Sequence, residues 1–452
     1  MIMELKRAAF KAYDIRGKYP SEINEEMAYR IGRVYVDLFK SKKVVVGHDI
    51  RLSGPQIRDA LVRGFTEMGC DVVDIGQCGT EMIYFATSFL KLDGGIMITA
   101  SHNPKDYNGM KLVREGARPI SSDTGLKEIE ERVIAGNLGT TAAVKGTVVQ
   151  KDVMTDYVTH IVGYVDKKLL KPLKVVVNAG NGSAGPVIDA MEKYLPFKLI
   201  KINNKPDGNF PNGVPNPLLV ENREATAKAV RENKADVGVA WDGDFDRCFF
   251  FDEKGDMIEG YYIVGLLAKS FLLKTPGAKI IYDPRLIWNT IEIVKEAGGT
   301  PVLCRSGHTF IKEMMRKVNA VYGGEMSAHN YFREFTFCDS GMLTCLLVLE
   351  LICQDSRPLS AMMAERMERY PISGEMNSTV KDAAAIMKKV EKLYGSKGKI
   401  DKTDGLSVSY DKWRFSLRIS NTEPVIRLNV ESRGDKKLVA EKTKELLSVI
   451  RG

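Results

Sequence analysis

A serine lies in a polar loop that directly follows a short apolar segment. The loop, residues 99–104, reads Thr-Ala-Ser-His-Asn-Pro, and Lys111 follows it closely. Ser101 can accept a phosphoryl group there, because loop amides and the Lys111 ammonium group both stabilise phosphate oxygens. The same residues also fit an ordinary Asn-Pro turn in which Ser101 and Asn103 bond only to the backbone. The G-x-S-x-G turn of many serine hydrolases is absent, which argues against that class.

Three aspartates alternate in a second loop. Residues 242–247 read Asp-Gly-Asp-Phe-Asp-Arg and lie between two apolar stretches. The carboxylates of Asp242, Asp244 and Asp246 repel one another unless a cation lies among them, and Mg²⁺ prefers oxygen ligands of this kind. The loop therefore predicts a magnesium site.

Two other interpretations of this acidic loop are weaker. An EF-hand calcium loop would match the three aspartates and Glu253 at position twelve, but it requires Gly at position six, where Arg247 stands. The following segment, Cys248–Phe251, is typical of a buried strand rather than of a calcium loop. A solvated acidic turn is the remaining alternative, and the apolar strands predicted on both sides disfavour it.

A third loop combines a carboxylate, a hydroxyl and an imidazole. Residues 323–330 read Gly-Gly-Glu-Met-Ser-Ala-His-Asn. Glu325 and Ser327 are spaced to hydrogen-bond neighbouring hydroxyls of a sugar, and His329 can transfer a proton. His308 lies upstream in the segment Ser-Gly-His-Thr and is a second histidine candidate. Each histidine taken alone is equally consistent with a structural role.

Hydrogen-bond donors also cluster near the C-terminus. The cluster consists of Arg418, Ser420, Asn421, Thr422 and Arg427. Its guanidinium groups, hydroxyls, amide and backbone N–H groups can form a phosphate-binding nest, and a cationic surface hairpin is the alternative. Together the four groups predict one reaction, the transfer of a phosphoryl group between an enzyme side chain and a sugar phosphate.

The elements that position these loops repeat three times along the chain. Each copy has a lysine, three apolar residues, a turn, an amphipathic helical segment and a second apolar strand that runs into a polar loop. The first strands are predicted at residues 43–46, 174–177 and 279–282, and the loop-bearing strands at 95–98, 236–240 and 320–322. Short apolar strands that alternate with helices predict mixed or parallel sheets, whose ligands lie beyond the strand ends.

The C-terminal region follows a different pattern. Helical segments at 383–394 and 436–450 flank alternating strands at 413–419 and 425–430, which is typical of an α+β domain. We therefore predict an α/β protein with three related domains and a smaller α+β domain. The predicted domains are residues 1–148, 149–254, 255–366 and 367–452.

Composition restricts the classes of function. Hydrophobic residues make up 44% and charged residues 27% of the chain, as in soluble globular proteins. The formal net charge of +8 is not concentrated in any run of like charges, which favours an anionic small substrate over a nucleic acid.

Residues 1–10 lack the core of a signal peptide, and the most apolar run, 342–353, is too short to span a membrane. The seven scattered cysteines predict reduced thiols and a cytoplasmic location.

The motifs resemble, in order, those of the α-D-phosphohexomutase superfamily. Residues 10–17 (Phe-Lys-Ala-Tyr-Asp-Ile-Arg-Gly), 99–104, 242–247, 324–329 and 418–424 carry the resemblance. Residues 108–120, 207–217 and 259–267 are particularly similar to the bacterial phosphomannomutases of that superfamily. The resemblance implies four domains around a central active-site cleft.

The resemblance also implies the reaction and the residues that perform it. Mannose 6-phosphate and mannose 1-phosphate would interconvert through a phosphoserine and a hexose 1,6-bisphosphate, with Mg²⁺, and would supply GDP-mannose synthesis. The implied metal ligands are Ser101, Asp242, Asp244 and Asp246. The implied catalytic residues are Ser101, Lys111, Arg16, His102, Arg247 and His329, with either Lys111 or His329 as the general base. The implied substrate-binding residues are Tyr13, Arg285, His308, Glu325, Ser327, Arg418, Ser420, Asn421, Thr422 and Arg427.

Several positions depart from the superfamily pattern and leave alternatives open. His48 stands where Arg is frequent, Asn178 where Asp is frequent, Phe245 and Ala328 where Gly is common, and Arg285 where related enzymes can use Lys.

A glucose-preferring or dual-specificity mutase is the alternative within the class. A non-catalytic metal-binding or sugar-phosphate-binding protein is the alternative outside it. We expect sugar phosphates as partners, no nucleic acid or membrane, and a monomer or homodimer.

Overall fold

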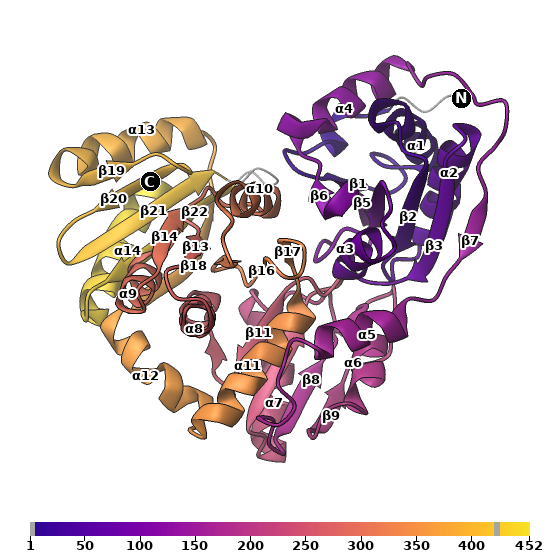
Figure 1. The fold of residues 1–452 in the computed structure, drawn as a ribbon. Helices are drawn as coiled ribbons and strands as arrows, with labels where there is room; N and C mark the ends of the chain where they lie inside the picture. The colour runs from indigo at the N-terminus through magenta and orange to yellow at the C-terminus, as the bar shows by residue number, and fades with distance from the viewer. Residues whose placement is uncertain (1–4, 420–424) are drawn as a thin grey trace. The chain divides into compact units, whose positions relative to one another are not determined.

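The computed structural model describes residues 5–419 and 425–452 (Figure 1). The chain divides into two compact units. The first unit combines residues 1–257 with 334–356, and the second combines residues 258–333 with 357–452. No helix within the described ranges has an apolar stretch that could reach across a membrane. The predicted Ser420, Asn421 and Thr422 lie outside the described residues.

The first sheet of the first unit is mixed. Its strands are β1 Ile15–Lys18, β2 Lys43–His48, β3 Asp71–Gln77, β4 Gly94–Ile98, β5 Tyr107–Arg114, β6 Arg118–Pro119 and β7 Val148–Gln150, in the order β1-β5-β4-β2-β3-β7 with β6 beside β5. Strands β4, β2, β3 and β7 are parallel, and β5 returns antiparallel to β4. The associated helices are α1 Glu25–Phe39, α2 Gly54–Glu67, α3 Thr80–Phe89 and α4 Leu126–Ala135.

Helices α1 and α2 pack closely because glycines lie where they cross. A Cβ atom on Gly32 would lie 2.6 Å from the carbonyl oxygen of Leu61, and one on Gly64 would lie 2.3 Å from that of Tyr29. Alternate residues of the parallel strands, such as Val44 and Val46 of β2, are buried in the same core as these helices. The rigid sheet that results ends in the loops that carry the predicted chemistry.

The other two predicted copies have the same strand order as the first. In the first unit it is β11-β10-β8-β9, formed by β8 Lys174–Asn178, β9 Lys198–Ile202, β10 Val237–Trp241 and β11 Cys248–Phe251. In the second unit it is β16-β15-β13-β14, formed by β13 Lys279–Tyr282, β14 Thr300–Leu303, β15 Tyr322–Gly324 and β16 Asn330–Phe332. Both match β5-β4-β2-β3, with three parallel strands and one antiparallel return strand. The predicted repeat and the α/β class are confirmed.

Helices surround these two sheets. The first unit contains α5 Met154–Val162, α6 Ala184–Glu192, α7 Glu224–Asn233, α11 Gly341–Asp355 and strand β17 Cys338–Asp339. The second unit contains α8 Gly260–Lys274, α9 Trp288–Glu296, α10 His308–Val318 and α12 Leu359–Arg369, and the chain passes between the units at β12 Met257–Ile258. Short 3₁₀ helices cover Arg7–Ala9, Glu115–Ala117, Ser122–Thr124, Val220–Asn222 and Gly395–Lys397.

One predicted strand is displaced. The prediction placed it at residues 320–322, whereas β15 runs from Tyr322 to Gly324. The N–H group of Ala320 donates to Met315 at the end of α10, so the chain is still leaving the helix there. Glycines are weak strand formers, but a Cβ on Gly324 would lie 2.5 Å from Val264 of α8, and close packing therefore requires glycine.

The C-terminal sheet is entirely antiparallel. Its order is β18-β22-β21-β20-β19, with β18 Ile372–Thr379, β19 Lys399–Asp401, β20 Leu406–Ser409, β21 Trp413–Ile419 and β22 Val425–Ser432. Helices α13 Ala383–Tyr394 and α14 Lys436–Arg451 share its core. The predicted α+β arrangement is confirmed, and the bounds of α13 and β21 match the prediction. All seven cysteines are free and buried, as the expectation of reduced thiols requires.

Residues 334–356 belong with the first unit, although the sequence prediction places them in the third domain. Glu350 of α11 accepts a hydrogen bond from the N–H group of Asp166 at 2.7 Å. Cys353 accepts one from the N–H group of Lys171 at 3.2 Å. The domain bounds themselves remain predictions.

Candidate active site

Ser101 lies in a buried, left-handed turn after β4. Its φ angle is +49° and its relative exposure is 4%. The guanidinium group of Arg51 holds this turn through the carbonyl oxygens of Ser101 (3.0 Å), Asn103 (2.6 Å), Pro104 (2.6 Å) and Tyr107 (2.8 Å). One arginine therefore fixes the path of the loop that carries the serine.

Asp49 and Thr99 complete the support of the serine loop. Asp49 accepts hydrogen bonds from the N–H group of Arg51 at 2.9 Å and from Oγ1 of Thr99 at 2.7 Å. Thr99 in turn accepts one from the N–H group of Ser101 at 2.8 Å. Sequence analysis missed Asp49 and Arg51 as supporting residues. A usable signal existed, because both directly follow the first strand of a repeat.

The hydroxyl of Ser101 contacts the acidic loop. Its Oγ donates to Oδ2 of Asp242 at 2.8 Å and lies 3.0 Å from Nδ1 of His102. Arg247 donates to the same hydroxyl at 3.4 Å and to Asp242 at 2.6 Å, and it also bonds to His102. The serine and aspartate loops, predicted separately from two repeats, therefore meet within the first unit.

A glycine permits the two loops to approach each other. A Cβ atom on Gly243 would lie 2.5 Å from the carbonyl oxygen of Ser101. Two residues further along the chain, Phe245 adopts a φ of +51°, a conformation that favours glycine. Its ring packs on Gly79, whose hydrogen leaves room that a side chain would fill. Burial of the Phe245 ring compensates for the strained backbone.

The three aspartates are buried and close enough to share one ion. Asp242, Asp244 and Asp246 can each offer an oxygen within 4.8 Å of the others. Lys111 donates to Asp244 at 2.7 Å and to Asp246 at 2.5 Å. Burial raises the pKa of Asp244, but the charge and hydrogen bond of Lys111 outweigh this effect and hold that pKa below its ordinary value.

These residues fit Mg²⁺. Oδ1 of Asp244 is buried and has no hydrogen-bond partner, so an oxygen ligand is available. Three carboxylates face two cations, Lys111 and Arg247, which leaves one formal negative charge. A phosphoryl group on Ser101 would add up to about two more negative charges, and a divalent cation would offset them.

Lys111 and His102 have opposite protonation states. Burial lowers the pKa of Lys111, but the charges of Asp244 and Asp246 outweigh burial and hold that pKa above its ordinary value. Burial and then the charges of Arg247 and Arg16 lower the pKa of His102 well below its ordinary value. Lys111 is therefore a fixed cation, and His102 is a neutral imidazole.

Arg16 joins the same site. It donates to Oδ1 of Asn103 at 2.8 Å and pairs with Asp14 at 2.5 Å. Tyr13, predicted to bind substrate, lies half-buried in the turn just before β1. The first unit thus brings together Ser101, His102, Lys111, Arg16, Arg247 and the three aspartates, while Tyr13 lies on the adjacent turn.

In the second unit, Arg285 organises the predicted sugar clamp. It donates to both carboxylate oxygens of Asp283 at 2.9 Å, to Glu325 at 3.2 Å and to Ser327 at 3.1 Å. His329 lies 3.2 Å from Glu325 through Nδ1. Ala328, between Ser327 and His329, has a φ of +73°, a conformation that favours glycine.

The remaining predicted residues of the second unit are dispersed around this clamp. Oε2 of Glu325 accepts a hydrogen bond from Tyr331 at 2.6 Å, a residue that sequence analysis missed. His308 is buried at the start of α10, and its Nδ1 lies 3.3 Å from Nζ of Lys312. Arg418 pairs with Asp404 at 2.7 Å, and Arg427 pairs with Glu375 at 3.3 Å.

Arg418 and Arg427 face each other directly across β21 and β22. Like charges in such a pair repel, so this position is costly unless acidic groups or an anion compensate. Asp404 forms an ion pair with Arg418, and Glu375 forms one with Arg427. Both arginines therefore have a carboxylate partner in the described part of the chain, and the phosphate site stays a prediction.

Comparison with known proteins accounts for almost the whole chain. Residues 7–138, 155–255 and 259–370 match the alpha/beta/alpha domains I, II and III of phosphoglucomutase/phosphomannomutase, and residues 375–448 match the C-terminal domain. The chain belongs to the phosphoglucomutase/phosphomannomutase family. The predicted resemblance is confirmed.

Several members of the phosphoglucomutase/phosphomannomutase family are similar over their full length. A protein of Xanthomonas campestris named "Phosphohexose mutases" is 56% identical, with 98% of this chain and 99% of the relative covered. The "Phosphomannomutase" of Salmonella typhimurium is also 56% identical with the same coverage. A family structure from Burkholderia thailandensis has a TM-score of 0.89 at 32% identity, covering 99% of this chain and 98% of that one.

Arg285 neutralises two buried carboxylates in this family member, and its removal should destabilise the second unit. We expect Arg285→Ala to lower the free energy of unfolding by about 3–5 kcal/mol, because Asp283 and Glu325 would remain buried without their cation. Urea unfolding would measure the change. The control is Lys402→Ala, which breaks an exposed pair with Glu391 and should cost less than about 1 kcal/mol. Equal effects of the two changes would contradict the prediction.

Glu81 links α3 to the start of α11. Its carboxylate accepts hydrogen bonds from Ser340 at 2.8 Å, from the N–H group of Gly341 at 2.6 Å and from Tyr157. Burial raises the pKa of Glu81 to about 8, although hydrogen bonds from Tyr157 and Ser340 act to lower it. The neighbouring Thr80 donates to Asp244, so this helix start also supports the acidic loop.

Glu81 should make stability depend on pH. The folded protein retains the Glu81 proton up to about pH 8, whereas the unfolded chain releases it near its ordinary pKa of 4.5. The free energy of unfolding should therefore fall as pH rises through this window. We expect Glu81→Gln to reduce that fall when urea unfolding is compared at about pH 5 and about pH 8. Glu26→Gln, a change on the exposed side of α1, should leave it unaltered. An unchanged pH dependence in Glu81→Gln would refute this role.

Proposed function

We propose that the protein is a phosphomannomutase that interconverts mannose 6-phosphate and mannose 1-phosphate through a phosphoserine at Ser101. The observation that carries the proposal is the contact of Oγ of Ser101 with Asp242 at 2.8 Å, within a buried cluster of three carboxylates. Full-length relatives named "Phosphomannomutase" at 53% to 56% identity support the choice of mannose.

Ser101 carries the phosphoryl group in the proposed mechanism. Its phosphate passes to the free hydroxyl of the sugar monophosphate, which forms the hexose 1,6-bisphosphate and frees the Ser101 hydroxyl. The bisphosphate then turns over, its other phosphate returns to Ser101, and the isomeric monophosphate leaves. Positioning and charge neutralisation dominate such a transfer, because little covalent chemistry falls to the protein.

Charged groups around Ser101 would stabilise the transferred group. Asp242, Asp244 and Asp246, together with the serine phosphate, would hold Mg²⁺, which supplies positive charge to phosphate oxygens. Arg247 and Lys111 would add fixed positive charge, and Arg16 would contribute from beside Asn103. Lys111 is a poor general base because its two carboxylate partners stabilise the protonated form. We therefore assign the proton transfer from the sugar hydroxyl to His329 rather than to Lys111.

The second unit would supply the binding groups for the sugar phosphate. Glu325 and Ser327, oriented by Arg285, would hydrogen-bond sugar hydroxyls. Arg418 and Arg427 would bind the phosphate that does not react. Tyr13, His308 and the loop residues Ser420, Asn421 and Thr422 complete the proposed binding set.

The wider setting follows from the same proposal. The four proposed domains are residues 1–148, 149–254, 255–366 and 367–452. The enzyme would act in the cytoplasm as a monomer or homodimer, with hexose 1,6-bisphosphate as activator, and its product would enter GDP-mannose synthesis. Its partners would be sugar phosphates rather than nucleic acids.

A coupled assay of both sugar 1-phosphates, with a catalytic amount of bisphosphate, tests the proposal. We expect conversion of mannose 1-phosphate that requires Mg²⁺. A second candidate, a mutase that accepts glucose as well, is favoured by the relative named "Phosphohexose mutases", and comparable rates with both sugars would select it. Absence of turnover, together with no phosphate on Ser101 by intact mass after incubation with bisphosphate, would leave only a binding protein.

A further inference from the structure

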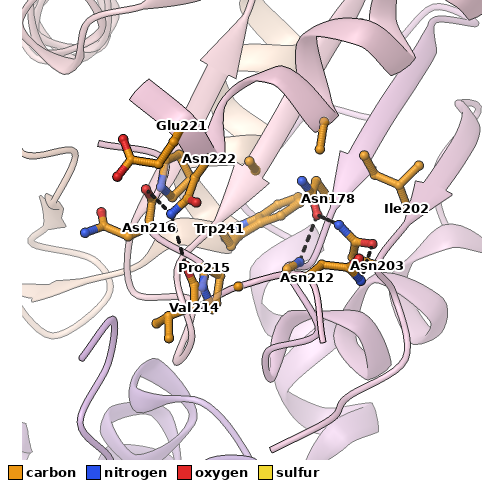
Figure 2. A pocket seen from close by; sticks show the side chains of 15 residues that line it. Asn178, Ile202, Asn203, Asn212, Val214, Pro215, Asn216, Glu221, Asn222 and Trp241 are labelled. Atoms are coloured by element: carbon orange, nitrogen blue, oxygen red, sulfur yellow. Dashed lines mark hydrogen bonds between the residues drawn. The ribbon is translucent and has the colours of Figure 1, made fainter. Parts of the chain in front are cut away.

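A cavity of about 350 Å³ lies at the end of the second sheet, within the first unit (Figure 2). It is bounded by the ends of β8, β9 and β10 and by the segment 212–225. Ligands of α/β sheets bind at this edge, beyond the carboxyl ends of parallel strands. The cavity contains none of the residues assigned above to phosphoryl transfer or sugar binding.

The repeat explains why a cavity exists here. In the first copy, the N–H group of Arg51 donates to Asp49 at 2.9 Å, and in the third, that of Arg285 donates to Asp283 at 2.8 Å. In the second copy, the N–H group of Gly180 donates to Asn178 in the same way at 2.9 Å. A glycine therefore stands where the other two copies have a large cation. Both Asn178 and Gly180 line the cavity.

The lining is rich in amides and almost uncharged. Within the described part of the chain, five asparagines contribute to it and Glu221 is its single ionisable side chain; the asparagines are Asn178, Asn203, Asn212, Asn216 and Asn222. No Lys or Arg among the described residues lines the cavity, so a phosphate or carboxylate ligand would have no cation to pair with there. Amides both donate and accept hydrogen bonds, as sugar hydroxyls do.

Trp241 supplies an unsatisfied donor. The residue is 1% exposed, and its indole Nε1 is buried without a hydrogen-bond partner. In Figure 2 the indole of Trp241 lies between Asn222 and Asn178, two residues that line the cavity. A buried Trp N–H group normally has a partner, and leaving one unsatisfied is unfavourable. A ligand hydroxyl that enters the cavity would accept this hydrogen bond.

The asparagines are held in place before any ligand binds. Asn212 donates from Nδ2 to Asn203 at 3.0 Å and to Asn181 at 2.9 Å. Asn222 donates from Nδ2 to the carbonyl oxygens of Val214 and Asn216, both at 3.1 Å, which leaves its Oδ1 as an acceptor. A set of fixed donors and acceptors lowers the entropic cost of binding.

We propose that this cavity is a second ligand site that binds one uncharged hexose unit through its hydroxyl groups. Its volume lies in the range of small-molecule sites, and the amides of its lining match the donors and acceptors of sugar hydroxyls. The site is independent of the proposed phosphoryl transfer, since it uses neither Ser101 nor the aspartates.

Saturation-transfer difference NMR and calorimetry with D-mannose, D-glucose and methyl α-D-mannoside test the proposal on the full chain. We expect the wild-type protein to bind at least one of them weakly. Trp241→Phe keeps an aromatic ring and removes the N–H group, and it should weaken binding about tenfold at a temperature where thermal unfolding shows the variant to be folded. Binding of the free hexoses alone would indicate a site for free sugar, and binding of the methyl glycoside would indicate one that also takes glycosidically linked hexose.

Controls separate this cavity from the sugar clamp. Glu325→Ala alters the clamp and should leave hexose binding unchanged, whereas Asn216→Ala should weaken it. Binding that is lost in Glu325→Ala but retained in Trp241→Phe would overturn the proposal and place the hexose at the clamp. Absence of binding by the wild-type protein to all three sugars would overturn it as well. Neither result would affect the assay of mannose 1-phosphate turnover.

Discussion

Ser101→Ala should abolish mutase turnover while the protein remains folded. The substitution removes the only atom proposed to carry the phosphoryl group, so we expect the rate to fall by at least about 10³-fold. Arg51 holds the serine turn through backbone carbonyl oxygens, which the substitution leaves in place, and the fold should therefore persist. The coupled assay and intact mass after incubation with bisphosphate would measure turnover and phosphoryl uptake.

A matched control for this prediction is Ser183→Ala. Ser183 is a buried serine of the same unit whose hydroxyl makes no hydrogen bond. Its replacement should leave both turnover and phosphoryl uptake unaltered. Substantial turnover in Ser101→Ala, or phosphate on that variant, would require another carrier residue and would end the phosphoserine hypothesis.

Removing the metal, or one of its proposed ligands, should have the second largest effect. We expect EDTA to eliminate turnover and Mg²⁺ to restore it. Asp244→Asn removes one carboxylate charge from the cluster, and it should raise the Mg²⁺ concentration required and lower turnover by about 10²-fold or more. Calcium should bind but support little turnover, because its looser coordination would misplace the phosphoryl oxygens.

The control for the metal prediction is Asp252→Asn. Asp252 is also buried in the first unit, but its carboxylate accepts hydrogen bonds from the N–H groups of Lys254 and Asp256 and lies outside the aspartate cluster. This variant should keep the wild-type dependence on Mg²⁺. Full activity in excess EDTA would show that the aspartates have another role.

The protonation of Lys111 depends on the same aspartates. Because Asp244 and Asp246 both bind its ammonium group, replacing either aspartate weakens the attraction that keeps Lys111 protonated. Its protonation is therefore a consequence of the acidic loop rather than of lysine chemistry alone. The effect of Asp244→Asn should accordingly include weaker positioning of Lys111.

The loops and their immediate strands follow from local sequence. Each polar loop comes directly after a short apolar strand, and strand length and loop chemistry both depend on neighbouring residues. For this reason the position of Ser101, the Asp242 loop and Glu325 at strand ends could be predicted, as could the bounds of α13 and β21. The displaced strand β15 shows the limit, since its glycines are explained only by the packing of α8.

Charge pairing between distant residues could not be predicted in this way. Lys111 was expected near Ser101, but its bonds to Asp244 and Asp246 join residues more than 130 positions apart. Arg51 follows the first strand of a repeat and Glu81 is an ordinary charged residue, and neither position reveals its partners in the sequence. Their roles appear only when the serine turn and the start of α11 surround them.

The sequence by itself determined the α/β class, the threefold repeat and the residue types of the reactive loops, because strand periodicity and loop chemistry are local properties. The tertiary structure alone decided which buried charges are paired, how Phe245 occupies a left-handed turn, and where Gly180 leaves a cavity beside Trp241. These features depend on contacts between segments far apart in the chain. Burial then sets their energy, because an unpaired charge or donor is costly only where water is excluded.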